Sequence, residues 1–166
     1  MITIIAGTNR PGSRTSALSR FYLAQFHEAG VEAQVFDLAQ FASWQRDEVF
    51  IAQEKQFLLH ASQFVFILPE YNGSIPGVFK LMLDISDIKS CWYNKKVMLV
   101  GLSTGRAGNL RGLDVTTNMC HYLNMHVFPL KLPMSGIQHL MGADGQVHDE
   151  PTIALIQQQI QAFIRF

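Results

Sequence analysis

The stretch QFVFILPEYNGSIPG, residues 63–77, joins the two patterns that decide the fold. Its first part, QFVFILP (63–69), is a nearly continuous apolar run, which predicts a strand buried on both faces. Its second part, EYNGSIPG (70–77), is a tight polar turn. The segment 76–88 then has an apolar stripe at helical spacing, made of Val78, Leu81, Met82 and Ile85. A buried strand followed by a polar loop and a helix is typical of a parallel α/β sheet, in which ligands bind in the loops after the strands.

The same alternation of strand and helix recurs along the whole chain. Strands are predicted at 1–7, 31–38, 63–69, 96–103 and 126–132. Helices are predicted at 15–29, 48–61, 76–88, 109–124 and from Pro151 onward. The stretch 131–150 is predicted to be a long loop that serves as a functional flap or a partner contact. This alternation predicts one α/β domain over residues 1–166, with a five-stranded parallel sheet between two layers of helices.

Two helices are predicted to present distinct inward and outward faces. The first helix is expected to direct Ala17, Leu18, Phe21 and Ala24 inward, which leaves Leu23 and Phe26 outside that stripe. The last helix is expected to bury Ile153, Ile156, Ile160, Phe163 and Ile164. Its outward face is expected to carry Gln157, Gln158, Gln159 and Gln161.

Composition excludes several classes of protein. The 13 basic residues balance the 13 acidic ones, so we expect neither nucleic acid nor an anionic membrane surface as a partner. Cys91 and Cys120 form neither a disulfide framework nor a metal spacing, which favours a reducing compartment. The opening MITIIAG lacks the features of a signal peptide, and no apolar stretch reaches the ~18 residues that cross a bilayer. We therefore expect a cytoplasmic protein with no metal site.

The loop GTNRPGSRTS, residues 7–16, has the composition of an anion site. Backbone N–H groups at a helix N-terminus bind anions, and this loop adds hydroxyls and two arginines, Arg10 and Arg14. A nucleoside-triphosphate loop would need lysine where Ser13 stands. The dinucleotide motif G-x-G-x-x-G is absent, and the loop holds no cysteine for phosphatase chemistry. A monophosphate held by hydroxyls and amides remains, as in flavodoxin-like folds that bind FMN; the alternative is an ordinary capped turn.

The loops after the third and fourth strands suit the edge of a planar ring. In PEYNGSIPG (69–77), Gly73 permits a positive φ or a close backbone approach, and Tyr71 offers a flat face. Ser74 is expected to cap the following helix, with Pro76 in its first turn. In STGRAGN (103–109), backbone and hydroxyls are expected to contact the polar edge of the ring. Its arginine, Arg106, faces either a second anion or solvent.

The chain resembles the NAD(P)H-dependent FMN reductase family of the flavodoxin-like superfold. PEYNGSIPG is the most specific piece, GTNRPGSRTS resembles the family's phosphate loop, and STGRAGN resembles its third loop. The resemblance implies a three-layer α/β/α fold with five parallel strands in the order 2-1-3-4-5. The segment 86–95, SDIKSCWYNK, is peculiar to this chain, so it leaves the substrate side of the pocket undefined.

The resemblance also implies the roles of the loop residues. The FMN phosphate would be held by Thr8, Arg10, Ser13, Thr15 and Ser16. The isoalloxazine ring would be surrounded by Pro69, Glu70, Tyr71, Asn72, Gly73, Ser74, Ser103, Thr104, Gly105 and Arg106. NADPH or NADH would deliver hydride to the flavin, and the reduced flavin would pass electrons to a free flavin, a quinone, an azo dye or a metal oxyanion. The chemistry resides in the cofactor, so no catalytic residue is assigned.

Two further functions stay open at this point. One is an electron carrier like a flavodoxin, although flavodoxins are typically very acidic and this chain has no net charge. The other is a regulatory module that kept the fold without flavin. By resemblance we also expect a homodimer or homotetramer. Leu23 and Phe26 lie outside the inward stripe of the first helix and are expected to leave apolar surface for a partner. Trp92 and Tyr93 line a subunit contact, the flavin pocket or a satellite core, and the sequence does not choose among these.

Overall fold

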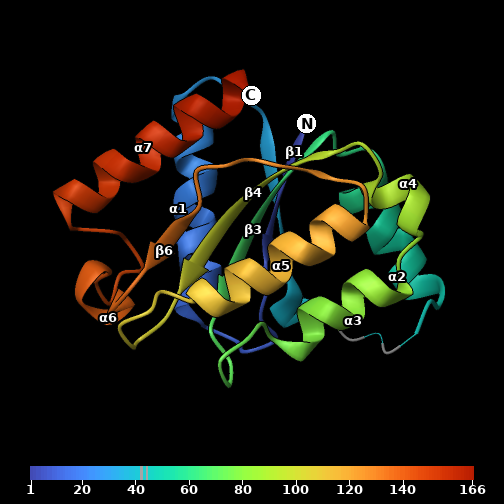
Figure 1. The fold of residues 1–166 in the computed structure, drawn as a ribbon, viewed down its shortest axis with the longest axis horizontal. Helices are drawn as coiled ribbons and strands as arrows, with labels where there is room; N and C mark the ends of the chain where they lie inside the picture. The colour runs from blue at the N-terminus through green and yellow to red at the C-terminus, as the bar shows by residue number, and fades with distance from the viewer. Residues whose placement is uncertain (42, 44) are drawn as a thin grey trace.

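The computed structural model describes residues 1–41, 43 and 45–166, and it shows three layers with a parallel sheet in the middle (Figure 1). The sheet has the order β2-β1-β3-β4-β5, and β6 also pairs with β4. Its strands are β1 (Ile2–Ala6), β2 (Ala33–Asp37), β3 (Gln63–Pro69), β4 (Lys96–Leu102), β5 (His126–Val127) and β6 (Leu132–Met134). The predicted parallel sheet with the order 2-1-3-4-5 is therefore confirmed.

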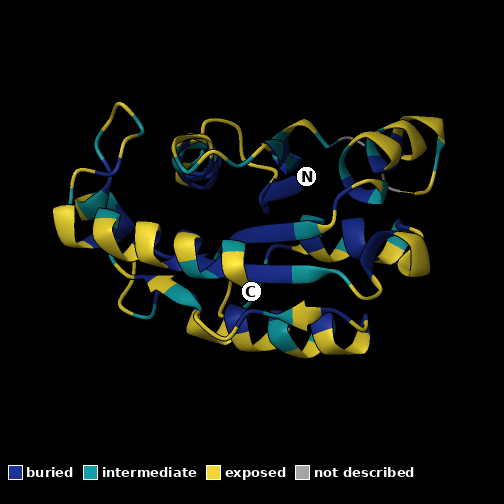
Figure 2. Ribbon diagram, turned by 90° about the horizontal axis from the view of Figure 1, so that it is seen from above, coloured by how far each residue is buried: buried dark blue, intermediate teal, exposed yellow. Residues whose placement is uncertain are grey.

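Helices cover both faces of the sheet (Figure 2). One core packs α1 (Arg14–Glu28) and α7 (Glu150–Arg165) against one side of the strands. A second core packs the opposite side against α2 (Glu48–Gln53), the π-helical η2 (Glu54–Leu59), α3 (Gly77–Ile85), α4 (Ile88–Trp92) and α5 (Leu110–Tyr122). Two short elements complete the fold, the 3-10 helix η1 (Leu38–Gln40) and α6 (Ile137–Leu140). The central strands β3 and β4 are almost wholly buried, as their apolar sequences predict.

The predicted strand at 126–132 was wrong in its extent, because β5 and β6 are separated by an irregular segment. Pro129 lies in that segment and has no N–H to donate to a ladder. Gln159 was predicted on the exposed face of the last helix, yet it is fully buried. Its side-chain amide donates to the Leu130 carbonyl at 2.9 Å and its oxygen accepts from the Tyr22 hydroxyl at 2.9 Å. Leu130 lies in the break between β5 and β6, and the Gln159 side chain thus gives the Leu130 carbonyl a hydrogen bond in place of one from a neighbouring strand.

The inward face of α1 also differs from the prediction. Leu18, Tyr22 and Phe26 are fully buried, whereas Ala24 is exposed. Phe26 is therefore a core residue and leaves no surface for a partner. Tyr22 can be buried on this face because its hydroxyl donates a hydrogen bond to the buried Gln159 side chain.

The segment 86–95 forms α4, which the sequence patterns did not predict. Trp92 is fully buried, with its indole N–H 2.7 Å from the Ser86 hydroxyl, while Tyr93 keeps 37% of its surface exposed. Of the alternatives that the sequence left open, the core position is therefore the correct one for Trp92. At the other end of α3, Pro76 occupies the N-cap, so the predicted capping role of Ser74 and the placement of Pro76 inside the first turn were wrong. Ser74 instead exchanges two backbone hydrogen bonds with Tyr71 and closes the turn between them.

None of the helices described at residues 1–41, 43 and 45–166 combines the length and the apolar character that a membrane span requires. Over the same residues, no three His, Cys, Asp or Glu side chains gather closely enough to hold a metal ion. Cys91 and Cys120 are buried free thiols. Burial raises the pKa of each thiol to about 12, which makes both poor nucleophiles at neutral pH.

Candidate functional site

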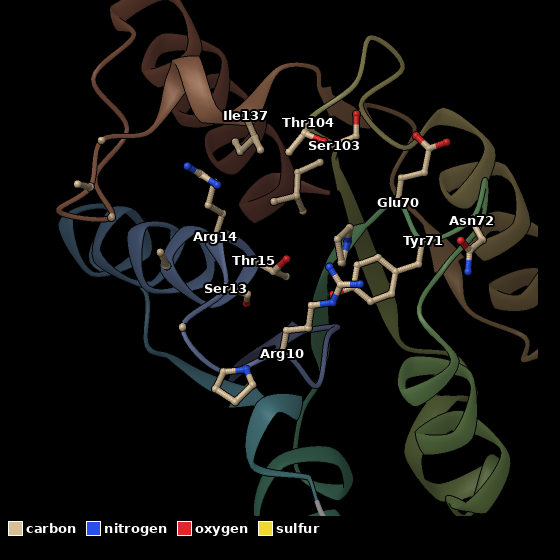
Figure 3. Close-up of a pocket in the computed structure, with 18 residues that line it drawn as sticks. Arg10, Ser13, Arg14, Thr15, Glu70, Tyr71, Asn72, Ser103, Thr104 and Ile137 are labelled. Atoms are coloured by element: carbon tan, nitrogen blue, oxygen red, sulfur yellow. The ribbon is translucent and has the colours of Figure 1, made fainter.

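A cleft of about 670 Å³ opens at the carboxyl ends of β1, β3 and β4 (Figure 3). Its volume lies within the range of ordinary small-molecule sites. The first loop contributes Arg10, Pro11, Gly12, Ser13, Arg14, Thr15 and Ala17. The second and third loops contribute Pro69, Glu70, Tyr71, Asn72, Leu102, Ser103 and Thr104. The remaining wall comes from Ile137, Gly142, Ala143 and Gly145, which lie between β6 and α7.

The first loop ends in a capped helix that faces the cleft. The Ser13 hydroxyl accepts the Ser16 amide at 3.1 Å and so serves as the N-cap of α1. The Ser16 hydroxyl donates to Asp37 at the end of β2, which ties the loop to the sheet. The first-turn amides of Arg14 and Thr15 have no carbonyl partner within the helix, as at every helix N-terminus. Thr15 points its hydroxyl toward the cleft (Figure 3), so amides, a hydroxyl and guanidinium groups face one space.

A second unit joins the first loop to the second across the cleft. The hydroxyls of Thr8 and Tyr71 are hydrogen-bonded at 2.5 Å, and Thr8 is fully buried. The Arg10 guanidinium lies 4.2 Å from the centre of the Tyr71 ring, and the two side chains are drawn together in Figure 3. This distance is typical of a cation–π contact. Tyr71 is therefore held at its hydroxyl by Thr8 and covered on one face of its ring by Arg10.

The second loop is shaped by backbone conformation. Asn72 and Gly73 both have positive φ, at 52° and 74°, so the chain turns sharply at the tip of PEYNGS. An added Cβ at Gly73 would meet only the Arg111 side chain, at 3.9 Å. The glycine is therefore required by its φ and not by crowding. Glu70, just before the tip, lies 3.5 Å from the exposed Arg111.

The third loop is fastened to the C-terminal part of the chain. The Ser103 hydroxyl accepts the Gly108 amide at 3.0 Å, and the Ser103 amide donates to the Met134 carbonyl at 3.0 Å. Asn109 occupies the N-cap position of α5 with φ of 66° and without a side-chain cap. Its amide group instead donates to the Leu68 carbonyl of β3 at 2.9 Å. Hydrogen bonds therefore hold the base of the third loop in place. Thr104, next to this base, is exposed and lines the cleft.

The predicted site residues divide into two groups. Those that line the cleft are Arg10, Ser13, Thr15, Pro69, Glu70, Tyr71, Asn72, Ser103 and Thr104. Those outside the lining are Thr8, Ser16, Gly73, Ser74, Gly105 and Arg106. Thr8 and Ser16 support the lining through the hydrogen bonds described above. Gly73 and Ser74 shape the turn, while Gly105 and Arg106 are exposed on the outside of the third loop.

Nine lining residues were not assigned to the site from the sequence, namely Pro11, Gly12, Arg14, Ala17, Leu102, Ile137, Gly142, Ala143 and Gly145. The first four lie in or beside the phosphate-loop motif, and Leu102 is the last residue of β4. The other four lie in the stretch 131–150, whose length indicated a functional flap without indicating which residues face the cleft. Taken together, the cleft offers hydrogen-bond donors at the first turn of α1 and a lining of mixed polar and apolar residues toward Tyr71.

The chain is similar in sequence to known flavin-dependent reductases. The family model described as NADPH-dependent FMN reductase matches residues 1–139. An NAD(P)H-dependent FMN reductase of Pseudomonas aeruginosa is 27% identical over 169 residues, which cover 95% of this chain and 90% of that protein. An FMN-dependent NADPH-azoreductase of Staphylococcus saprophyticus is 33% identical over 116 residues, covering 61% of this chain and 60% of that one.

A shorter match and a solved structure extend the comparison. A 2-hydroxy-1,4-benzoquinone reductase of Burkholderia is 29% identical over 109 residues, or 62% of this chain and 58% of that protein. The structure of FerB, a flavoenzyme NAD(P)H:(acceptor) oxidoreductase of Paracoccus denitrificans, superimposes with a TM-score of 0.81 at 22% identity, covering 99% of this chain and 94% of that one. At that identity, the likeness shows a shared fold.

Proposed function

The chain belongs to the NADPH-dependent FMN reductase family, and from that premise we propose that its cleft binds FMN with the phosphate at α1 and the ring beside Tyr71. The protein is a flavin-dependent oxidoreductase that uses NAD(P)H. The observation that carries the placement is the cleft itself, because it brings all three glycine-rich loops into one space. The proposal thus assigns to this chain the phosphate and ring positions that its loops suggest.

The residues present fit the flavin. A phosphate at the first turn of α1 would meet free amides, the Thr15 hydroxyl and the Arg10 guanidinium, all of which favour a dianion. Gly12 has a φ of 65° and open space around its Cα, so the loop can approach a ligand closely there. The slot between Tyr71 and the third loop is lined by Leu102, Ser103 and Thr104, which suits a ring with one apolar face and one polar edge.

FMN, when bound, supplies a ring that accepts hydride from a nicotinamide and passes the electrons to an acceptor. The protein's own part is to bind and orient. Tyr71, held by Thr8, fixes one boundary of the slot, and the rigid base of the third loop fixes the other. Such positioning matters because hydride transfer requires the two rings to lie about 3–3.5 Å apart.

The acceptor is proposed to be a small quinone, an azo compound or a free flavin, with a metal oxyanion as a further choice. The relatives named as benzoquinone reductase and azoreductase support the first two. The alternative, an electron carrier without its own NAD(P)H activity, has support from the structure of an archaeal flavodoxin, which superimposes with a TM-score of 0.66. That likeness concerns the fold, so the family match favours the reductase.

A homodimer or homotetramer is proposed as the assembly. Support comes from apolar side chains on the outer face of α5, where Leu110, Val115 and Tyr122 are exposed at 52%, 40% and 85%. We propose these exposed residues as the contact surface in place of Phe26 and Trp92, because Phe26 and Trp92 are buried in the core. A cytoplasmic location is likewise proposed, and the two unpaired buried cysteines are consistent with a reducing compartment.

The test of the reductase function is an anaerobic reaction of FMN-loaded protein with NADPH or NADH. The expected result is loss of the flavin's visible absorption within seconds to minutes of mixing with at least one nucleotide. A flavin that stays oxidised with both nucleotides, yet is reduced by dithionite, would overturn the reductase and support the electron carrier.

A further inference from the structure

Two arginines line the cleft, and they extend in different directions (Figure 3). Arg10 lies over the Tyr71 ring, whereas Arg14 extends from the first turn of α1 toward Ile137 and the C-terminal segment. Among the described residues, neither guanidinium has a carboxylate within 4.0 Å. The cleft therefore presents two positive charges at separate places.

The nearby carboxylates do not neutralise Arg14. Glu70, which lines the cleft, lies 3.5 Å from Arg111. Asp144 belongs to the turn at 142–145 but does not line the cleft. Its carboxylate accepts the Gln146 amide and contacts the His148 ring at 3.0 Å. Arg14 thus remains available for an anion that enters from solvent.

FMN brings one phosphate, and under the proposed function this phosphate meets the first-turn amides, Thr15 and Arg10. A second anion would account for Arg14. NADPH differs from NADH only in the phosphate on its adenosine ribose. An arginine can hold such a phosphate through two parallel hydrogen bonds, which an uncharged ribose hydroxyl cannot match.

The wall beside Arg14 leaves room for such a ligand. Gly142, Ala143 and Gly145 line it with backbone and one methyl group. A Cβ at Gly142 would come within 2.6 Å of the Asp144 carboxylate, and one at Gly145 within 3.2 Å of the Ala17 side chain. The Asp144 and His148 side chains pack against Gly142 but do not line the cleft, so the turn contributes no long side chain to this wall.

We propose that Arg14 binds the 2′-phosphate of NADPH and thereby makes this protein prefer NADPH to NADH. The inference rests on the proposed function, because it assumes that a nicotinamide dinucleotide enters this cleft. It adds a specificity-determining residue that touches the co-substrate and not the flavin.

The test uses FMN-loaded protein and the substitution Arg14→Gln, with Arg20→Gln as the matched control. Arg20 is an exposed arginine on the same helix and lies outside the cleft. We expect the ratio of kcat/KM for NADPH to that for NADH to fall about 10- to 100-fold in Arg14→Gln, the size of one charge-assisted contact. The values for NADH and the Kd for FMN should change less than about twofold, and Arg20→Gln should leave the ratio unchanged.

A binding measurement gives a second readout that does not depend on turnover. Calorimetry with 2′,5′-ADP and 5′-AMP as probes should show weaker binding of 2′,5′-ADP to Arg14→Gln and unchanged binding of 5′-AMP. An unchanged NADPH-to-NADH ratio would overturn the inference. If FMN binding instead weakens 10-fold or more at an unchanged ratio, Arg14 belongs to the flavin phosphate site. Failure of the proposed function looks different, because unmodified protein loaded with FMN would then react with neither nucleotide.

Discussion

The two walls of the cleft are built in opposite ways. The motif wall, residues 10–15 and 69–72, carries chemical groups on loops that directly follow β1 and β3. The C-terminal wall, Ile137 with the turn 142–145, carries mostly backbone. The motif wall is joined by side chains, through the Thr8–Tyr71 hydrogen bond and the Arg10 stack. The C-terminal wall is held by backbone hydrogen bonds such as that from the Gly142 amide to Gln146 at 3.0 Å.

This difference suggests that the motif wall determines which ligand binds, whereas the C-terminal wall determines the shape of the cleft. Substitutions of charged side chains and donors in the motif wall should change what the cleft binds, whereas loss of the Thr8–Tyr71 bond that holds this wall should cost stability. Substitutions that disturb the C-terminal wall should change stability or access, because they move backbone. Four substitutions and one ligand comparison test that separation, beginning with the largest expected effect.

Gly108→Ala should be the most damaging change, because Gly108 joins the third loop to the strand that carries the C-terminal wall. It has φ of 55°, and an added Cβ would come within 2.6 Å of the Pro133 backbone. Strain at positive φ and overpacking together suggest a loss of about 3 kcal/mol in the free energy of unfolding. Urea denaturation measures it.

Gly105→Ala is the matched control for Gly108→Ala. It lies in the same loop, is exposed, and has no atom within 4 Å of the added Cβ. The expected change is within about 0.5 kcal/mol. Equal losses for the two variants would mean that the contact between Gly108 and β6 does not hold the walls together.

Arg10→Ala should weaken FMN binding while leaving the fold intact. Loss of one charge-assisted contact to the phosphate corresponds to about 1.5–3 kcal/mol, or about 10- to 100-fold in Kd. Quenching of flavin fluorescence on titration measures the Kd. A change of less than about twofold would place the Arg10 side chain away from the bound phosphate, with its stack on Tyr71 as its only contact.

Tyr71→Phe should cost about 1 kcal/mol of stability, because it removes the bond between Tyr71 and the buried Thr8 hydroxyl and leaves that hydroxyl only the hydrogen bond that it accepts from the Arg10 amide. Thr8→Val should cost a similar amount, and the double variant should cost less than the sum of the two. Thermal unfolding of the three variants and the parent gives the coupling energy. Strict additivity would show that the bond across the motif wall contributes nothing.

Asp144→Asn should have the smallest effect, a local loosening of the C-terminal wall. The hydrogen bonds from the Gln146 amide and then from His148 hold the pKa of the Asp144 carboxyl below its ordinary value. A depressed pKa means that the charged carboxylate stabilises the turn at neutral pH and that this support is lost as the pH falls below about 4.

Hydrogen exchange followed by mass spectrometry on the peptide containing residues 141–147 measures that loosening. Exchange at pH 7 should be faster in Asp144→Asn, whereas Asp114→Asn, an exposed carboxylate near Lys131, should leave it unchanged. Identical exchange in all three proteins would mean that the carboxylate does not fasten the turn.

Much of the motif wall could be predicted from the sequence, because a local motif determines it. The apolar run before Glu70 gives the strand, and the strand's end places the polar loop at the ligand edge of the sheet. Ser74 was misassigned as a cap because its backbone pairs with Tyr71 within the turn, and a cap pattern does not distinguish the two.

The C-terminal wall could not be predicted in the same way, because tertiary contacts place it. Gly145 faces the cleft only because its turn packs against Ala17 of α1, more than a hundred residues earlier. Gln159 was assigned to solvent because an amide on a helix is usually exposed, yet the break between β5 and β6 requires its hydrogen bond. Trp92 could not be assigned to core or surface because α4 has too few residues to show a helical period.

The most direct test of the central claim compares the binding of FMN and riboflavin, which differ only in the phosphate. If the motif wall holds the phosphate at the first turn of α1, FMN should bind at least about 10-fold more tightly than riboflavin, as measured by fluorescence titration in one buffer. The Arg10→Ala variant should reduce that difference, because it weakens FMN alone. Equal affinities for FMN and riboflavin in the unmodified protein would contradict the account.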